Sequence, residues 1–78
     1  MGTFKKISLS TELLPGILIR EFNRQKDDYE NYIIGNHIIE NDAYEVYPEG
    51  VDYLNKAGVL FYYPKNKMIT AGCEFWED

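Results

Sequence analysis

Hydrophobic and polar residues alternate in several short stretches of the chain, with the period expected of β-strands that bury one face. In the stretch 17–22, Ile17 and Ile19 fall on one face and Arg20 falls on the other. The entirely polar run 23–28 then separates this stretch from the next. The pattern predicts strands over residues 3–9, 17–22, 43–47, 59–63 and 68–75.

The segment 29–40 contains two Ile-Ile pairs on either side of Gly35-Asn36. Gly-Asn is a signal for a two-residue hairpin turn, because such turns need positive φ at one or both central residues. We therefore predict two short antiparallel strands here. A helix is the alternative, but Gly and Asn in its middle would cost about 1–1.5 kcal/mol together. We expect the isoleucines to pack in the core, with packing of a homodimer as the alternative use.

A helix is predicted over residues 48–57. Pro48 suits a first helical turn, where its missing N–H is not needed. Val51 and Leu54 then fall on one helical face, and Gly58 is a natural residue to follow the helix end.

The C-terminal part of the chain predicts a β-hairpin. Residues 59–63 are apolar on both faces, which is typical of a central strand, and residues 64–67 form the predicted turn before the strand 68–75. A single helical turn is predicted at 11–14 and a short tail at 76–78. Together these elements predict one α+β domain over residues 1–78, with a small, hairpin-rich antiparallel β-sheet and one short helix.

Carboxylates are numerous, so a catalytic pair of them is not excluded by counting, but a domain of this size has little room for a deep substrate cleft, and the other residue types of common catalytic and metal sites are scarce. The chain has one cysteine, Cys73, and one histidine, His37. Cys73 falls on the inward stripe of its predicted strand and is expected to be a small core residue, and His37 is expected to be an ordinary sheet or surface residue. No glycine-rich phosphate loop or zinc spacing occurs. We therefore expect no enzyme activity, no catalytic residues, no metal and no cofactor.

The chain has no apolar run approaching the roughly 20 residues needed to cross a bilayer, and no apolar run follows the basic residues near its start. A single cysteine also fits a reducing compartment. From these features we expect a cytoplasmic protein that has no contact with membranes.

Charge is distributed unevenly along the chain. The net charge is −5, but residues 1–26 sum to +3, whereas residues 27–55 carry eight acidic residues and no Lys or Arg. The same middle segment holds five of the seven tyrosines. Such acidity argues against direct binding of nucleic acid, because phosphates are met by Lys and Arg. It favours instead a basic protein or nucleoprotein partner.

These observations lead to a hypothesis of function. Carboxylates on a β-scaffold can take the positions of phosphates, so the chain is predicted to be an inhibitor that mimics nucleic acid, as phage counter-defence proteins of the anti-CRISPR kind do. An immunity protein or antitoxin that covers a basic toxin is one alternative, and a small self-associating structural subunit is another. The predicted partner-binding residues are Asp27, Asp28, Glu30, Glu40, Asp42, Tyr44, Glu45, Tyr47, Glu49, Asp52 and Tyr53.

Overall fold

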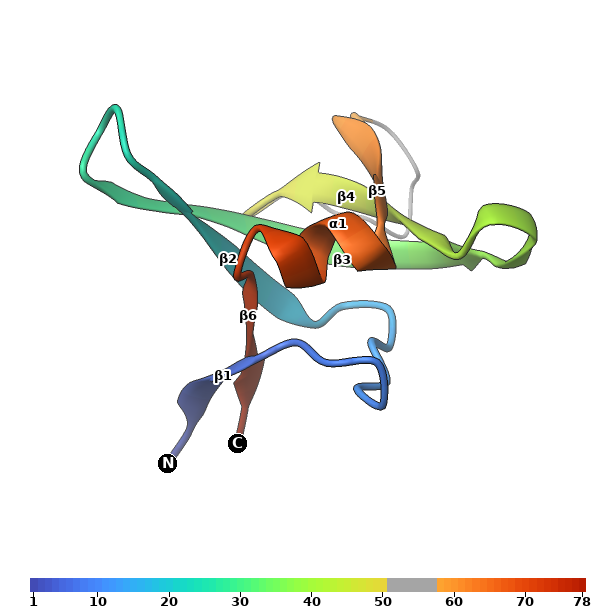
Figure 1. Cartoon of the computed structure of the whole chain (residues 1–78), viewed down its shortest axis with the longest axis horizontal. Coiled ribbons are helices and arrows are strands. Elements are labelled where there is room, and N and C mark those ends of the chain that lie inside the picture. The colour runs from blue at the N-terminus through green and yellow to red at the C-terminus, as the bar shows by residue number, and fades with distance from the viewer. Residues whose placement is uncertain (51–57) are drawn as a thin grey trace.

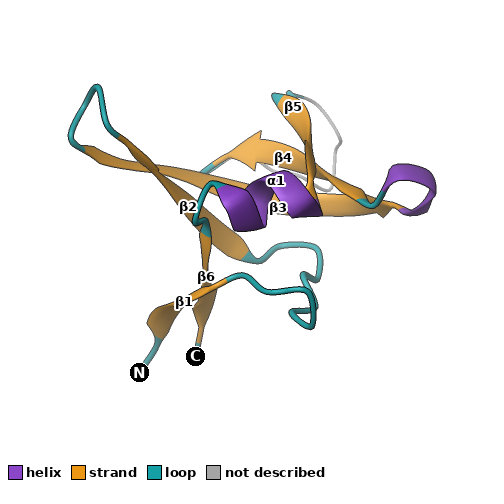
Figure 2. Ribbon diagram, viewed as in Figure 1, coloured by secondary structure: helices purple, strands orange, loops and turns teal. Residues whose placement is uncertain are grey.

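The computed structural model describes residues 1–50 and 58–78, and these residues form mostly antiparallel sheet with one short α-helix (Figures 1 and 2). The strand order of the single open sheet is β1-β6-β2-β3-β4-β5. The elements along the chain are β1 (Thr3–Lys6), β2 (Leu18–Asn23), β3 (Asp28–Ile38), the 3-10 turn η1 (Ile39–Asn41), β4 (Ala43–Pro48), β5 (Phe61–Pro64), α1 (Lys65–Thr70) and β6 (Glu74–Glu77).

The predicted hairpin over residues 29–40 is wrong, and so is its helical alternative, because β3 is one continuous strand across this segment. Its pairing with β4 shifts between Ile34 and His37, so that Gly35 and Asn36 together lie opposite Glu45. Two residues opposite one define a β-bulge. Gly35 is buried and does not have positive φ, so the sequence Gly-Asn supplies a bulge here instead of a turn.

The core lies between one face of the sheet and the helix α1. Ile19 from β2, Ile34 from β3 and Val46 from β4 are fully buried, and Met68 of α1 packs against them. Cys73 belongs to the same cluster, which confirms the prediction that it is a core residue. Alternation along the strands accounts for this burial, and the predicted strands 17–22 and 43–47 correspond to β2 and β4.

The predicted C-terminal hairpin does not form. Residues 59–63 were expected to form a central strand, but β5 lies at the edge of the sheet and Tyr62 is exposed. The predicted turn 64–67 contributes three residues to α1, which extends into the predicted strand 68–75. Pro64 ends the extended strand, and burial of Met68 then favours the helix. The residues after the helix form β6, which takes in part of the predicted tail and pairs with β1 and β2.

The first strand is shorter than predicted, because β1 ends at Lys6 and Leu9 is exposed. The predicted helical turn at 11–14 is absent, and Lys65 of α1 holds this loop instead. Its buried ammonium donates to the carbonyl oxygens of Leu9 at 3.0 Å and of Thr11 at 2.5 Å.

Most of the predicted helix 48–57 falls outside the described residues, and its first residue, Pro48, ends β4. The fold is therefore mostly β. The predicted antiparallel sheet is present, and the one short α-helix of the described residues, Lys65–Thr70, lies where a turn and a strand were predicted.

Candidate functional site

The first group of predicted acidic residues lies where β2 turns into β3. Glu30 accepts a hydrogen bond from Lys26 at 2.9 Å and another from Asn23. These bonds, with Lys26 the larger cause, hold the pKa of Glu30 below its usual value. Asp27 adopts positive φ in the turn, and the carboxylate of Asp28 accepts the N–H of Tyr29. Lys26 therefore neutralises part of this acidic group.

The second group lies at the other end of β3, around η1. Glu40 is in η1, and Asp42 follows it in a left-handed conformation. His37 donates from Nε2 to Oδ1 of Asp42 at 2.7 Å, and its ring stacks on Tyr44 at a centroid distance of 4.5 Å. Burial raises the pKa of Tyr44, and the charges of Asp42 and Glu12 raise it further, so both carboxylates act on the same ring.

The two acidic groups do not form one face. They lie at opposite ends of β3, along the longest axis of the described chain, which measures 30 Å (Figure 1). Glu49 lies apart from both groups and accepts a hydrogen bond from Asn31. Asp52 and Tyr53 are outside the described residues.

Three predicted site residues lie in β4 and have partners within the chain. Tyr44 is 5 % exposed and Tyr47 is fully buried, so neither ring is open to a partner in this conformation. Glu45 is half-buried and accepts both the N–H of Asn36 at 3.0 Å and the hydroxyl of Tyr47 at 3.3 Å. These contacts tie Glu45 to the bulge in β3.

A buried polar cluster that the sequence analysis did not identify joins Glu21, Tyr63 and Cys73. Tyr63 donates its hydroxyl to Glu21 Oε1 at 2.5 Å, and Cys73 Sγ lies 3.6 Å from both oxygen atoms. Burial raises the pKa of the Tyr63 hydroxyl, and burial also raises the pKa of the Cys73 thiol to about 11. A thiol that stays protonated is a poor nucleophile. The sequence signal for this cluster was Glu21, a charged residue that alternation places on the same side of β2 as Ile19.

The outward face of the sheet carries a row of polar residues that crosses the strands in register. Lys6 pairs with Glu74, Glu74 with Arg20, and Arg20 with Asn31, whose side chain reaches Glu49. Glu74 Oε1 accepts a hydrogen bond from Arg20 Nε at 2.7 Å, and both side chains are mostly buried. We call these five residues the polar row.

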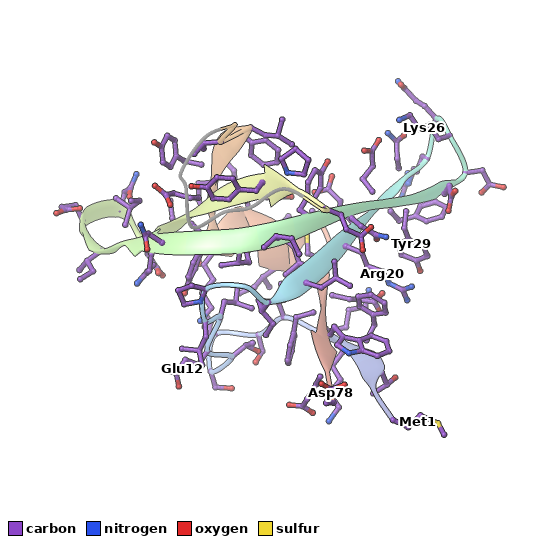
Figure 3. All side chains as sticks on the ribbon, turned by 180° about the vertical axis from the view of Figure 1, so that it is seen from behind. Met1, Glu12, Arg20, Lys26, Tyr29 and Asp78 are labelled. Carbon is purple, nitrogen blue, oxygen red and sulfur yellow. The ribbon has the colours of Figure 1, made fainter. Side chains whose placement is uncertain are left out.

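Aromatic rings surround Arg20 on this face. Its guanidinium lies 3.9 Å from the ring centre of Phe4 and 3.8 Å from that of Tyr29. Trp76 packs edge-to-face with Phe4, and Phe22 does so with Tyr29. Figure 3 shows Arg20 close to Tyr29 and both well away from Glu12. We call Phe4, Phe22, Tyr29 and Trp76, together with the polar row, the outward face; the alternation of Arg20 with inward isoleucines was its only signal in the sequence.

Within residues 1–50 and 58–78, no three His, Cys, Asp or Glu side chains are placed to hold a metal ion together. In the same residues, no helix has the length and hydrophobicity needed to cross a membrane.

Comparison of the chain with protein-family models, with curated proteins and with solved structures finds no match.

Proposed function

We propose that this chain is a non-enzymatic binding module that presents carboxylates to a basic protein partner, as an inhibitor that takes the place of nucleic acid. The observation that carries the proposal is the exposure of the acidic residues around η1 and their lack of a Lys or Arg partner in the described part of the chain. Among the described residues, Glu40 and Asp42 are exposed and neither forms an ion pair with Lys or Arg. Carboxylates that meet no Lys or Arg within the described residues can pair with a cation of another chain, and Asp42 does so in addition to its hydrogen bond from His37.

The acidic group at the start of β3 supports a second contact. Asp27 and Asp28 are exposed there, at the opposite end of a 30 Å axis from η1. One turn of DNA spans roughly 34 Å, so a basic groove that binds duplex has cations at a comparable separation. Electrostatic steering would make capture of such a partner fast, and added salt would weaken it.

The test is affinity capture from the cells that produce the chain, with elution by a salt gradient and identification by mass spectrometry. The pair Glu40→Lys and Asp42→Lys should abolish capture, because it replaces the two exposed carboxylates around η1 that have no Lys or Arg partner among the described residues. The pair Glu77→Lys and Asp78→Lys makes the same change in net charge at the C-terminal end and is the matched control. Circular dichroism establishes that both variants fold.

The proposal predicts capture by the wild type and by the Glu77/Asp78 control, elution at moderate salt, and displacement of the partner by added duplex DNA. Equal loss of capture in both variants would reduce the effect to net charge and contradict a surface around η1. Capture that duplex DNA does not displace would contradict mimicry of nucleic acid, and would favour the alternative of an immunity protein that covers a basic toxin.

A further inference from the structure

The outward face gathers four partly exposed aromatic rings around Arg20. Phe22 is 44 % exposed, Tyr29 is 43 % exposed and Trp76 is 36 % exposed. The helix α1 packs on the opposite face of the sheet, against Ile19 and Ile34. Trp, Tyr and Arg are the residue types that contribute most to binding energy in protein interfaces, and they occur together here.

The charges of this face indicate what kind of surface can cover it. Arg20 is neutralised by Glu74 within the chain, so the centre of the face offers no free charge to a nucleic acid or to a basic protein. At the rims, Lys6 lies at the β1 side and Glu49 lies beyond β4. The polar row therefore runs from a basic end to an acidic end.

We propose that the outward face is the interface between two copies of this chain. In a dimer with a two-fold axis parallel to the strands, the second copy presents the polar row in the reverse order. Lys6 of each copy then lies on the side of Glu49 of the other, Phe22 meets Phe22 near the axis, and Trp76 of each copy lies over β3 of the other. The proposal does not rest on the proposed function, because it uses a different face from the acidic residues around η1.

Packing through this face also avoids the repulsion that other surfaces would produce. Two copies with a net charge of −5 each repel one another, and contact through Glu40 and Asp42 would bring exposed carboxylates together. Pairing through the free edge of β1 is disfavoured by Lys5 and Lys6, since edge lysines oppose strand addition. Face-to-face packing of the sheets meets neither obstacle.

Sedimentation velocity from roughly 1 µM to roughly 1 mM, the range that resolves weak and moderate affinities, tests the proposal directly. The wild type should pass from monomer to dimer across this series. Raising NaCl from about 50 to about 500 mM should strengthen the dimer, because salt screens the repulsion between two acidic copies. A basic partner held by the acidic residues would respond to salt in the opposite direction.

Two substitutions locate the interface. Phe22→Asp replaces one of the exposed aromatic rings of the outward face with a charge and should weaken self-association by roughly tenfold or more. Ile39→Asp introduces the same charge at a residue of η1 that is 80 % exposed, and should leave self-association within about twofold of the wild type. Circular dichroism checks the fold of both variants.

The emission of Trp76, the only tryptophan, gives a second measurement that needs no variant. It should shift to shorter wavelength as concentration rises, because the indole becomes buried in the dimer. A wild type that stays monomeric throughout would overturn the proposal, and so would a dimer that forms with unchanged Trp76 emission or that persists in folded Phe22→Asp. None of these results bears on capture of a basic partner, so the two proposals can fail separately.

Discussion

The carboxylate of Glu45 accepts the backbone N–H of Asn36 at 3.0 Å, directly opposite the bulge that interrupts the β3–β4 ladder. A bulge leaves one residue without its regular partner in the ladder, and this side chain supplies the missing acceptor. Gly35, the other residue of the bulge, lies so close to β4 that a Cβ atom there would be 2.5 Å from Tyr47 Cε1. Contacts with Glu45 and Tyr47 of β4 thus favour a bulge at Gly35-Asn36 of β3.

Gly35→Ala should destabilise the protein by about 1–3 kcal/mol, the usual cost of forcing an extra group into packed surroundings. The comparison is Gly50→Ala, where nothing lies within 4 Å of the new Cβ and only the positive φ opposes the substitution. That variant should cost about 1–2 kcal/mol from backbone strain alone, because a residue with a Cβ atom is disfavoured at this φ. Urea unfolding of the two variants measures both values, and a Gly35→Ala variant as stable as the wild type would contradict the close contact.

The buried ammonium of Lys65 fixes the loop before β2 through two carbonyl oxygens, at Leu9 and Thr11. Lys65→Met keeps the aliphatic stem but leaves these two acceptors unsatisfied, so it should cost about 1–3 kcal/mol. Lys67→Met in the same helix is the matched control. Because Lys67 is exposed, this substitution should lower the free energy of unfolding by less than about 0.5 kcal/mol. Hydrogen exchange provides the specific readout. Protection should fall at Thr11, whose N–H bonds to Ser8, in the first variant only.

The parts of the fold that the sequence predicts are those set by neighbouring residues. Alternation alone places β2 and β4. The parts it misses depend on distant residues. A buried lysine in α1 is favourable only because the loop near Leu9 supplies acceptors 56 residues away. No local pattern at residues 64–70 contains that information.

The candidate site, like the fold, has features that the sequence predicts and features that depend on distant residues. The acidic residues can be counted from the sequence, but whether each is neutralised depends on the fold. Lys26 lies just before the cation-free segment and pairs with Glu30 inside it, whereas Glu40 has no ion pair in the described part of the chain. Burial of Tyr44 and Tyr47 was equally beyond the sequence, since a tyrosine in a strand can face either side of a sheet.

Stability should fall in alkaline solution, because burial raises the pKa of the Cys73 thiol from 9.0 to about 11. Both states hold the proton below pH 9. Above it, the unfolded chain loses the proton first, so the contribution of Cys73 is lost progressively until the pH passes the folded value. Midway between the unfolded and folded pKa values, the free energy of unfolding falls by about 1 kcal/mol per pH unit. The raised pKa of the Tyr63 hydroxyl acts in the same direction at higher pH.

Cys73→Ala isolates the part due to the thiol. Its free energy of unfolding at pH 8 should be somewhat lower than that of the wild type, because a buried sulfur atom is removed. Between pH 9 and pH 10, however, it should decline less steeply, by about 1 kcal/mol per unit. Urea titrations at several pH values measure the two slopes, and identical slopes would show that Cys73 does not contribute to the alkaline loss.

The two ion pairs of β6 should differ in their importance for stability, although both involve strand neighbours. Glu74 and Arg20 are 17 % and 25 % exposed in their side chains, whereas Glu77 and Lys5 are 49 % and 56 % exposed. Glu74→Gln leaves the guanidinium of Arg20 desolvated between two rings without its anion, and should cost about 1–3 kcal/mol. Glu77→Gln breaks a pair that water already screens, and should cost less than about 1 kcal/mol.

Thermal unfolding at low and high salt distinguishes the two ion pairs further, because salt should diminish the small effect of Glu77→Gln and leave most of the larger effect of Glu74→Gln. Equal losses would mean that burial of Arg20 between Phe4 and Tyr29 does not strengthen its dependence on Glu74.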